Sequence, residues 1–148
     1  MRALVFALRF RGRGTPVPGH AGRRRGVTTA PSQLFRTVLG PAGIEAAVEP
    51  VDGETATLEA DVQMTGERTF LESGRIRYGS AGTVTFRTVG EGVRGPSPIP
   101  GLVHGVVLWE VTGGDGAFTG ATGLITSNFT VSSEGEVLDD QLAHLFLL

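Results

Sequence analysis

The chain has 148 residues, of which 40% are hydrophobic and 19% are charged, so it can build the core of one domain and is not globally disordered. It contains no cysteine, which excludes a disulfide framework, a thiolate zinc site and a cysteine nucleophile. The formal net charge is −2. Every basic residue is an arginine, and we interpret the lack of lysine as the coding bias of a GC-rich bacterial genome.

The charge is distributed unevenly along the chain. Residues 1–28 hold seven arginines and no acidic residue, whereas residues 29–148 hold all 15 acidic residues. The segment 11–26 consists mostly of glycine, proline and arginine, with little to bury. We therefore expect residues 1–30 to form a disordered tail and residues 31–148 a single β-barrel domain. A natural start at Val27, which would make the tail non-native, stays open as an alternative.

Targeting and partner signals are weak. The apolar run from Ala3 to Leu8 is shorter than the ~7–15 residues of a secretory signal, and no run approaches the ~18 residues of a membrane helix. The acidic body argues against a nucleic-acid protein. We expect a cytoplasmic protein that binds neither nucleic acid nor membrane.

Short segments that alternate between apolar and polar residues follow one another through the chain. The first, 34–39, predicts a strand or a short helix, and 44–51 alternates poorly. Clear period-two alternation then predicts strands over 54–64, 68–78 and 83–89, with glycine-rich turns between them.

The second half of the chain repeats this pattern after an interruption. Residues 90–101 contain four glycines and three prolines, which predicts an irregular loop over a barrel mouth or a crossover. Further strands are predicted over 102–112, 124–132 and 137–148. About six to eight short strands without a long helix predict an all-β barrel or sandwich.

The most distinctive motif lies between the strands at 102–112 and 124–132. Its sequence, Gly113-Gly-Asp-Gly-Ala-Phe-Thr-Gly-Ala-Thr-Gly123, supplies glycines for a tight turn and an aromatic residue, Phe118, that can fold under it and seal a barrel end. This hairpin resembles the glycine signature of the allene oxide cyclase-like and dirigent-like barrels. The resemblance implies a small antiparallel closed β-barrel of about eight strands, with a hydrophobic cavity and a dimeric or trimeric state. Members of these families guide the cyclisation or coupling of reactive apolar molecules. The motif carries no catalytic residue; its alternative interpretation is a hairpin that recurs in unrelated β-proteins.

Carboxylates that share a strand face with apolar residues are candidate acids or bases, because one face of every strand in a closed barrel points inward. Glu72 shares its face with Phe70, Ile76 and Tyr78, and Glu110 shares its face with Leu108. The hydroxyl of Tyr78 can hold a carbonyl oxygen of a substrate by a hydrogen bond. The candidate catalytic residues are Glu72, Glu110 and Tyr78.

Candidate substrate-binding residues come from the same strands. They are the aromatic Phe86 and Trp109, which can stack on a flat molecule, and the polar His104 and Asn128. Structural interpretations remain open for all of these. Glu110 lies beside a turn where water can solvate it, Glu72 can pair with Arg87 across a hairpin, and a lone tryptophan or histidine is more often structural.

Other chemistries lack their motifs. The absence of lysine excludes a phosphate-binding loop of the Gly-Lys type, there is no His-Glu-x-x-His or Gly-x-Ser-x-Gly, and three scattered histidines do not predict a metal site. We expect no cofactor and no metal. The first hypothesis is a small barrel that binds an apolar small molecule as a cofactor-free cyclase or isomerase of secondary metabolism. The alternative is a non-catalytic ligand-binding or structural oligomeric barrel.

Overall fold

The computed structural model describes all 148 residues, which form eleven β-strands and one short 3₁₀ turn. Most strands show the expected period-two burial; in β5, for example, Ala56, Leu58 and Ala60 are buried and alternate with more exposed residues. The strands are β1 (Arg2–Pro16), β2 (Arg23–Ala30), β3 (Gln33–Gly40), β4 (Gly43–Pro50), β5 (Ala56–Met64), β6 (Thr69–Tyr78), β7 (Thr83–Thr88), β8 (Gly92–Pro96), β9 (Leu102–Gly114), β10 (Thr122–Ser132) and β11 (Glu136–Leu147), with the 3₁₀ turn η1 (Gly116–Phe118).

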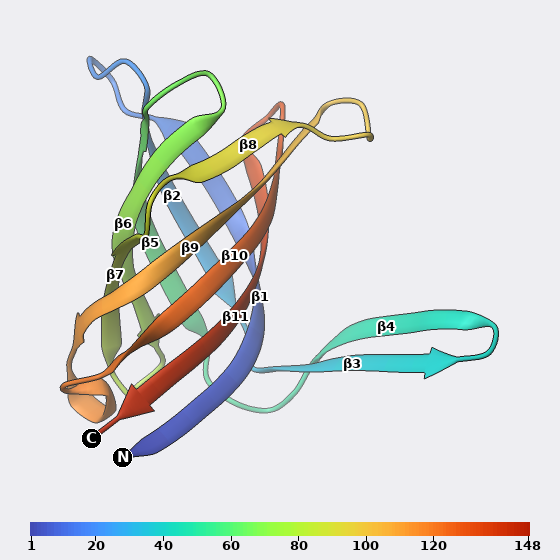
Figure 1. Cartoon of the computed structure of the whole chain (residues 1–148), viewed down its shortest axis with the longest axis vertical. Helices are drawn as coiled ribbons and strands as arrows, with labels where there is room; N and C mark the ends of the chain where they lie inside the picture. Colours follow the sequence, from blue (N-terminus) through green and yellow to red (C-terminus); the bar gives the residue numbers. More distant parts are fainter.

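The fold is a closed eight-stranded antiparallel β-barrel, as the sequence predicts (Figure 1). The strands run in the order β10-β11-β1-β2-β5-β6-β7-β9, and the additional pairing of β9 with β10 closes the ring. In this order β6 and β11 stand four positions apart in either direction, so they form opposite walls.

Two short strands share one position of the ring. Between β6 and β9, β7 pairs with both strands toward one end of the barrel, and β8 pairs with both toward the other. The expectation that 90–101 is wholly irregular is therefore wrong for 92–96. Gly92 allows this arrangement, because a Cβ there would lie 2.3 Å from the Phe70 ring.

The predicted tail belongs to the barrel. β1 pairs with β11 over residues 2–13 and with β2 over residues 11–16, and β2 pairs in turn with β5. Phe10 is fully buried in the core. The expected disordered tail at 1–30 is thus wrong, because the alternation Leu4, Phe6, Leu8, Phe10 gives β1 an inward apolar face between its arginines.

The strands β3 and β4 form a separate two-stranded sheet that projects from the barrel (Figure 1). We call residues 33–50 the arm. The segment 34–39 is therefore a strand and not a helix, but it is not a barrel strand. At the base of the arm, the side-chain amide of Gln33 pairs with the backbone of Arg9 as a neighbouring strand would. It donates to the Arg9 carbonyl at 2.9 Å and accepts from the Arg9 N–H at 2.7 Å.

One end of the barrel is sealed by aromatic side chains. Phe118 of η1 is buried and packs 5.3 Å from the Tyr78 ring, which also contacts Phe6 edge-on at 5.3 Å. A Cβ at Gly114 would collide with Phe118, so this glycine of the hairpin motif lets the plug fold under the turn. At the other end lie β8 and several loops (Figure 1). Residues of this end line a cavity.

No helix in the structure has the length and apolar character needed to cross a membrane.

Candidate functional site

A cavity of about 610 Å³ occupies the barrel at the end opposite the aromatic plug. Most of the surface that lines the cavity is apolar, and polar groups lie at particular points of it. Leu58, Ala60, Val62, Phe70 and Phe129 supply much of the apolar surface. Its volume lies in the range of small-molecule sites, about 300–1,000 Å³.

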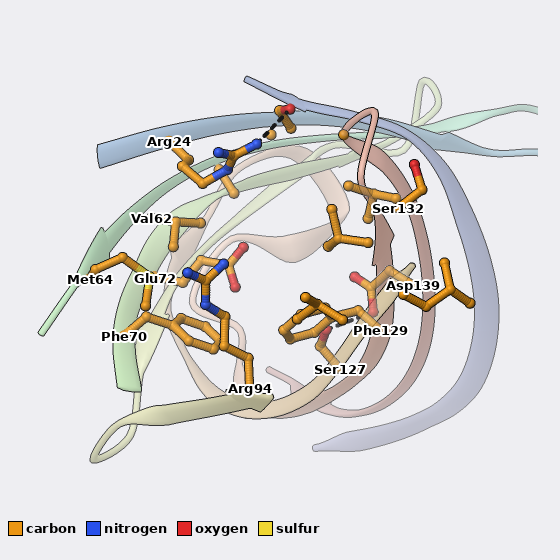
Figure 2. A pocket seen from close by; sticks show the side chains of 18 of the residues that line it. Arg24, Val62, Met64, Phe70, Glu72, Arg94, Ser127, Phe129, Ser132 and Asp139 are labelled. Atoms are coloured by element: carbon orange, nitrogen blue, oxygen red, sulfur yellow. Dashed lines mark hydrogen bonds between the residues drawn. The ribbon is translucent and has the colours of Figure 1, made fainter. Parts of the chain in front are cut away.

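Glu72 projects into this cavity from β6 (Figure 2). The inward phase of β6 is set by Phe70 and Ile76, which are buried on the same face. Only the backbone of Glu72 is hydrogen-bonded, to the Thr88 hydroxyl at 2.7 Å. The indole N–H of Trp109 lies close enough to lower the pKa of the carboxyl, but it makes no hydrogen bond of normal geometry. The carboxyl is therefore free to interact with a ligand.

Burial raises the pKa of Glu72 to about 8, and the negative charge of Asp139 adds to this effect. The Trp109 contribution opposes the shift but is smaller. At neutral pH the folded protein therefore holds Glu72 mainly as the neutral acid, inside an apolar wall.

Asp139 enters the cavity from β11 and is held firmly (Figure 2). The Ser127 hydroxyl donates to its Oδ1 at 2.6 Å, and the Gln141 amide donates to its Oδ2 at 2.8 Å. Burial raises the pKa of Asp139 to about 6, the two hydrogen bonds oppose that rise, and Asp140 adds to it. Near pH 7 Asp139 is thus mainly anionic while Glu72, on the opposite wall, is mainly neutral.

The predicted residue Tyr78 points inward but does not line the cavity. It lies at the closed end of the barrel against Phe6 and Phe118. Burial raises its pKa above the usual value. Six residues of strand, about 20 Å, separate it from Glu72, so the two do not form one site.

Phe86 and Trp109 are inside the barrel but stack on each other. Their ring centroids are 4.0 Å apart with an interplanar angle of 24°, and both are buried in the core. Neither lines the cavity. Both rings belong to the core and not to the cavity wall. Only the indole N–H of Trp109 lies near Glu72.

The other three predicted residues lie outside the barrel. Glu110 is half-buried on the outer face and accepts a 2.6 Å bond from Arg87, which corrects its expected inward position. His104 and Asn128 line an outer groove over β8, β9 and β10. Both faces of β9 are apolar, and because Trp109 is completely buried, the odd residues of β9 face inward and the even ones, including His104 and Glu110, face outward. In β10 the buried Ile125 and Ser127 likewise leave Asn128 on the outer face.

Sequence reasoning missed Asp139, Ser127 and the other buried polar residues of β10 and β11. A signal was present, since the apolar Ala143 and Leu145 fix the inward phase of β11 and place Asp139 and Gln141 on the same face. Thr28 is a further missed residue. It lines the cavity and its buried hydroxyl has no hydrogen-bond partner in the protein.

Comparison with known proteins gives no relative. No family model matches the chain, and neither a curated protein nor a solved structure matches it. The resemblance of the 113–123 hairpin to allene oxide cyclase-like and dirigent-like barrels therefore stays a prediction. No group of three or more histidine, aspartate or glutamate side chains is placed to hold a metal ion.

Proposed function

We propose that the barrel binds an apolar small molecule in its cavity and that Glu72 exchanges protons with it, as in a cofactor-free isomerase or cyclase. The observation that carries this proposal is a carboxyl without a hydrogen-bond partner for its oxygens, on the wall of a cavity of about 610 Å³. A raised pKa near 8 supports the same role, because general acids and bases work best near the ambient pH.

The chemistry needs no co-reactant. The neutral Glu72 acid donates its proton to an oxygen of the ligand, and the resulting carboxylate removes a proton from a carbon of the same ligand. A C–H bond is broken and an O–H bond is formed, so the ligand is isomerised and Glu72 returns to its starting state. The cavity contributes by holding the ligand in a reactive conformation.

Binding is tested with N-phenyl-1-naphthylamine, an uncharged dye that fluoresces in apolar surroundings. We expect saturable binding to the wild-type protein. Ala60→Trp and Val62→Phe place bulk inside the cavity and should weaken binding strongly, whereas Ser73→Trp, on the outer face of β6, should not. Circular dichroism and thermal melts establish that each variant is folded. Equal binding by all folded variants would place the dye outside the barrel and contradict the proposal.

Proton transfer is tested with 5-nitrobenzisoxazole, which opens when a base removes its C–H proton and breaks the N–O bond. We expect a rate that rises with pH through about 8, the pKa of Glu72. Glu72→Gln should lower this rate by about 100-fold, the usual size of a general-base contribution. Glu110→Gln, which changes a carboxylate on the outer face, should leave it unchanged. Dye binding without a Glu72-dependent rate would favour the non-catalytic ligand-binding alternative.

A further inference from the structure

Arginines gather where the cavity opens. Arg24 of β2 and Arg94 of β8 both line the cavity, and Figure 2 shows their side chains at its rim. Each occupies the inward phase of its strand, as shown by the buried Thr28 in β2 and the buried Gly92 in β8. Arg25 of β2 and Arg68, just before β6, also line the cavity.

None of these four arginines has an acidic partner. Five other arginines of the chain form ion pairs within 4.0 Å of a carboxylate, and none of the four that line the cavity does; the five are Arg9, Arg23, Arg36, Arg75 and Arg87. Arg24 makes one hydrogen bond, to the Gly14 carbonyl at 3.1 Å, which leaves most of its N–H donors unused. Glu67 is the one carboxylate that lines the cavity besides Glu72 and Asp139.

The chain has more acidic than basic residues, yet arginines outnumber carboxylates among the residues that line the cavity. Guanidinium groups bind carboxylates and similar oxyanions through paired N–H donors, and they bind more strongly at a rim that is partly shielded from water. The rest of the wall includes the apolar Val62, Phe70 and Phe129 and offers no further cation. An anionic group at the mouth and an apolar body beneath it match this arrangement.

We propose that the ligand is an amphipathic organic anion whose acidic head is held by Arg24 and Arg94 while its apolar body extends toward Glu72. This inference rests on the proposed ligand-binding function. The Arg94 N–H donates to the Arg68 carbonyl at 2.9 Å, so Arg94 lies level with Arg68. The four residues from Arg68 to Glu72 span about 13 Å of extended chain, so an apolar body that reaches from Arg94 to Glu72 is on the order of 10 Å long. The arginines thereby decide which end of the molecule meets Glu72.

The test compares two dyes of similar aromatic structure. The anionic 8-anilinonaphthalene-1-sulfonate carries the acidic group, and the uncharged N-phenyl-1-naphthylamine lacks it. Both are titrated into the wild-type protein, into Arg24→Gln/Arg94→Gln, and into the control Arg75→Gln/Arg77→Gln. The control removes two charges from the outer face of β6.

We expect the mouth variant to bind the sulfonate about tenfold more weakly or worse, the size of a lost charge-assisted contact. Its affinity for the uncharged dye and both affinities of the control should stay unchanged. Raising the salt concentration should weaken sulfonate binding in the wild type more than in the mouth variant.

Three results would overturn the inference. If the mouth variant binds the sulfonate as the wild type does, the arginines hold no anion, although the proposed function stands. If both dyes are weakened equally in the mouth variant, the arginines only shape the entrance. If neither dye binds the wild-type protein, the proposed function itself fails.

Discussion

At the scale of single residues, two glutamates of the same barrel have opposite environments. Glu72 faces the cavity and forms no ion pair, whereas Glu110 lies outside in a 2.6 Å ion pair with Arg87. The position of each follows from the phase of its strand, because a shift of one residue in a strand moves a side chain to the other face. Burial without a partner is what raises the pKa of Glu72.

The raised pKa of Glu72 predicts that stability falls as the pH rises. The unfolded chain releases this proton near pH 4.5 and the folded chain near pH 8, so the folded state holds the extra proton between these values. The stability associated with it is complete below pH 4.5 and is lost as the pH approaches 8. The loss is on the order of 3–5 kcal/mol at about 1.4 kcal/mol per pH unit.

Urea unfolding at pH 5 and pH 9 measures this effect. Relative to wild type, Glu72→Gln should be more stable at pH 9 than at pH 5, because glutamine stays neutral at both. Glu110→Gln is the matched control and should not gain stability at high pH. Parallel pH profiles for wild type and Glu72→Gln would show that the folded protein does not hold Glu72 as a neutral acid.

At the scale of elements, β1 and the arm differ in what they support. β1 completes the barrel wall between β11 and β2 and buries Phe10. The arm lies outside the ring, and the Val51 N–H donates to the Ser32 carbonyl at 2.9 Å where its two ends meet. One element is therefore part of the ring, and the other is an insertion between two strands of it.

Deletion experiments follow from this difference. A chain that begins at Val27 lacks β1 and the start of β2, so it leaves an edge of β11 unpaired and removes Phe10 from the core. We expect it to lose cooperative thermal unfolding and dye binding.

Replacing the arm, residues 33–50, with two glycines is the matched control. It should preserve a folded barrel, although it removes the bonds of Gln33 to Arg9. Cooperative unfolding of the shortened chain that begins at Val27 would contradict the role assigned to β1.

At the scale of the whole molecule, the arm presents apolar residues to solvent. Leu39 and Ile44 are 77% and 73% exposed, and an isolated two-stranded sheet is marginally stable in water. The expected dimer or trimer stays a prediction, and the arm is where it is tested. Light scattering should give an oligomer for the full chain and a monomer after removal of the arm. A monomeric full chain would contradict the expectation.

Local patterns were enough to predict much of this protein. The alternation around Ala56, Leu58 and Ala60 and around Phe70 and Ile76 predicted strands and the inward position of Glu72. The glycines of the 113–123 hairpin predicted the turn and the plug formed by Phe118. Strand alternation and turns depend on residues that are close in the chain, which is why the sequence alone predicts them.

Tertiary structure alone decided the rest. The arginine-rich start of the chain was predicted to be solvated because its strand is stabilised mainly by pairing with β11, more than a hundred residues away. The apolar faces of β9 did not reveal which side turns inward, so Glu110 and His104 lie outside the barrel and not inside it. In β10, Ile125 and Ser127 face inward, which leaves Asn128 outside. Asp139 shares the cavity with Glu72 only because ring closure makes β6 and β11 opposite walls. The sequence by itself determined strands and their local turns, and closure of the barrel decided which side chains share the cavity, because those contacts join residues that are distant in the chain.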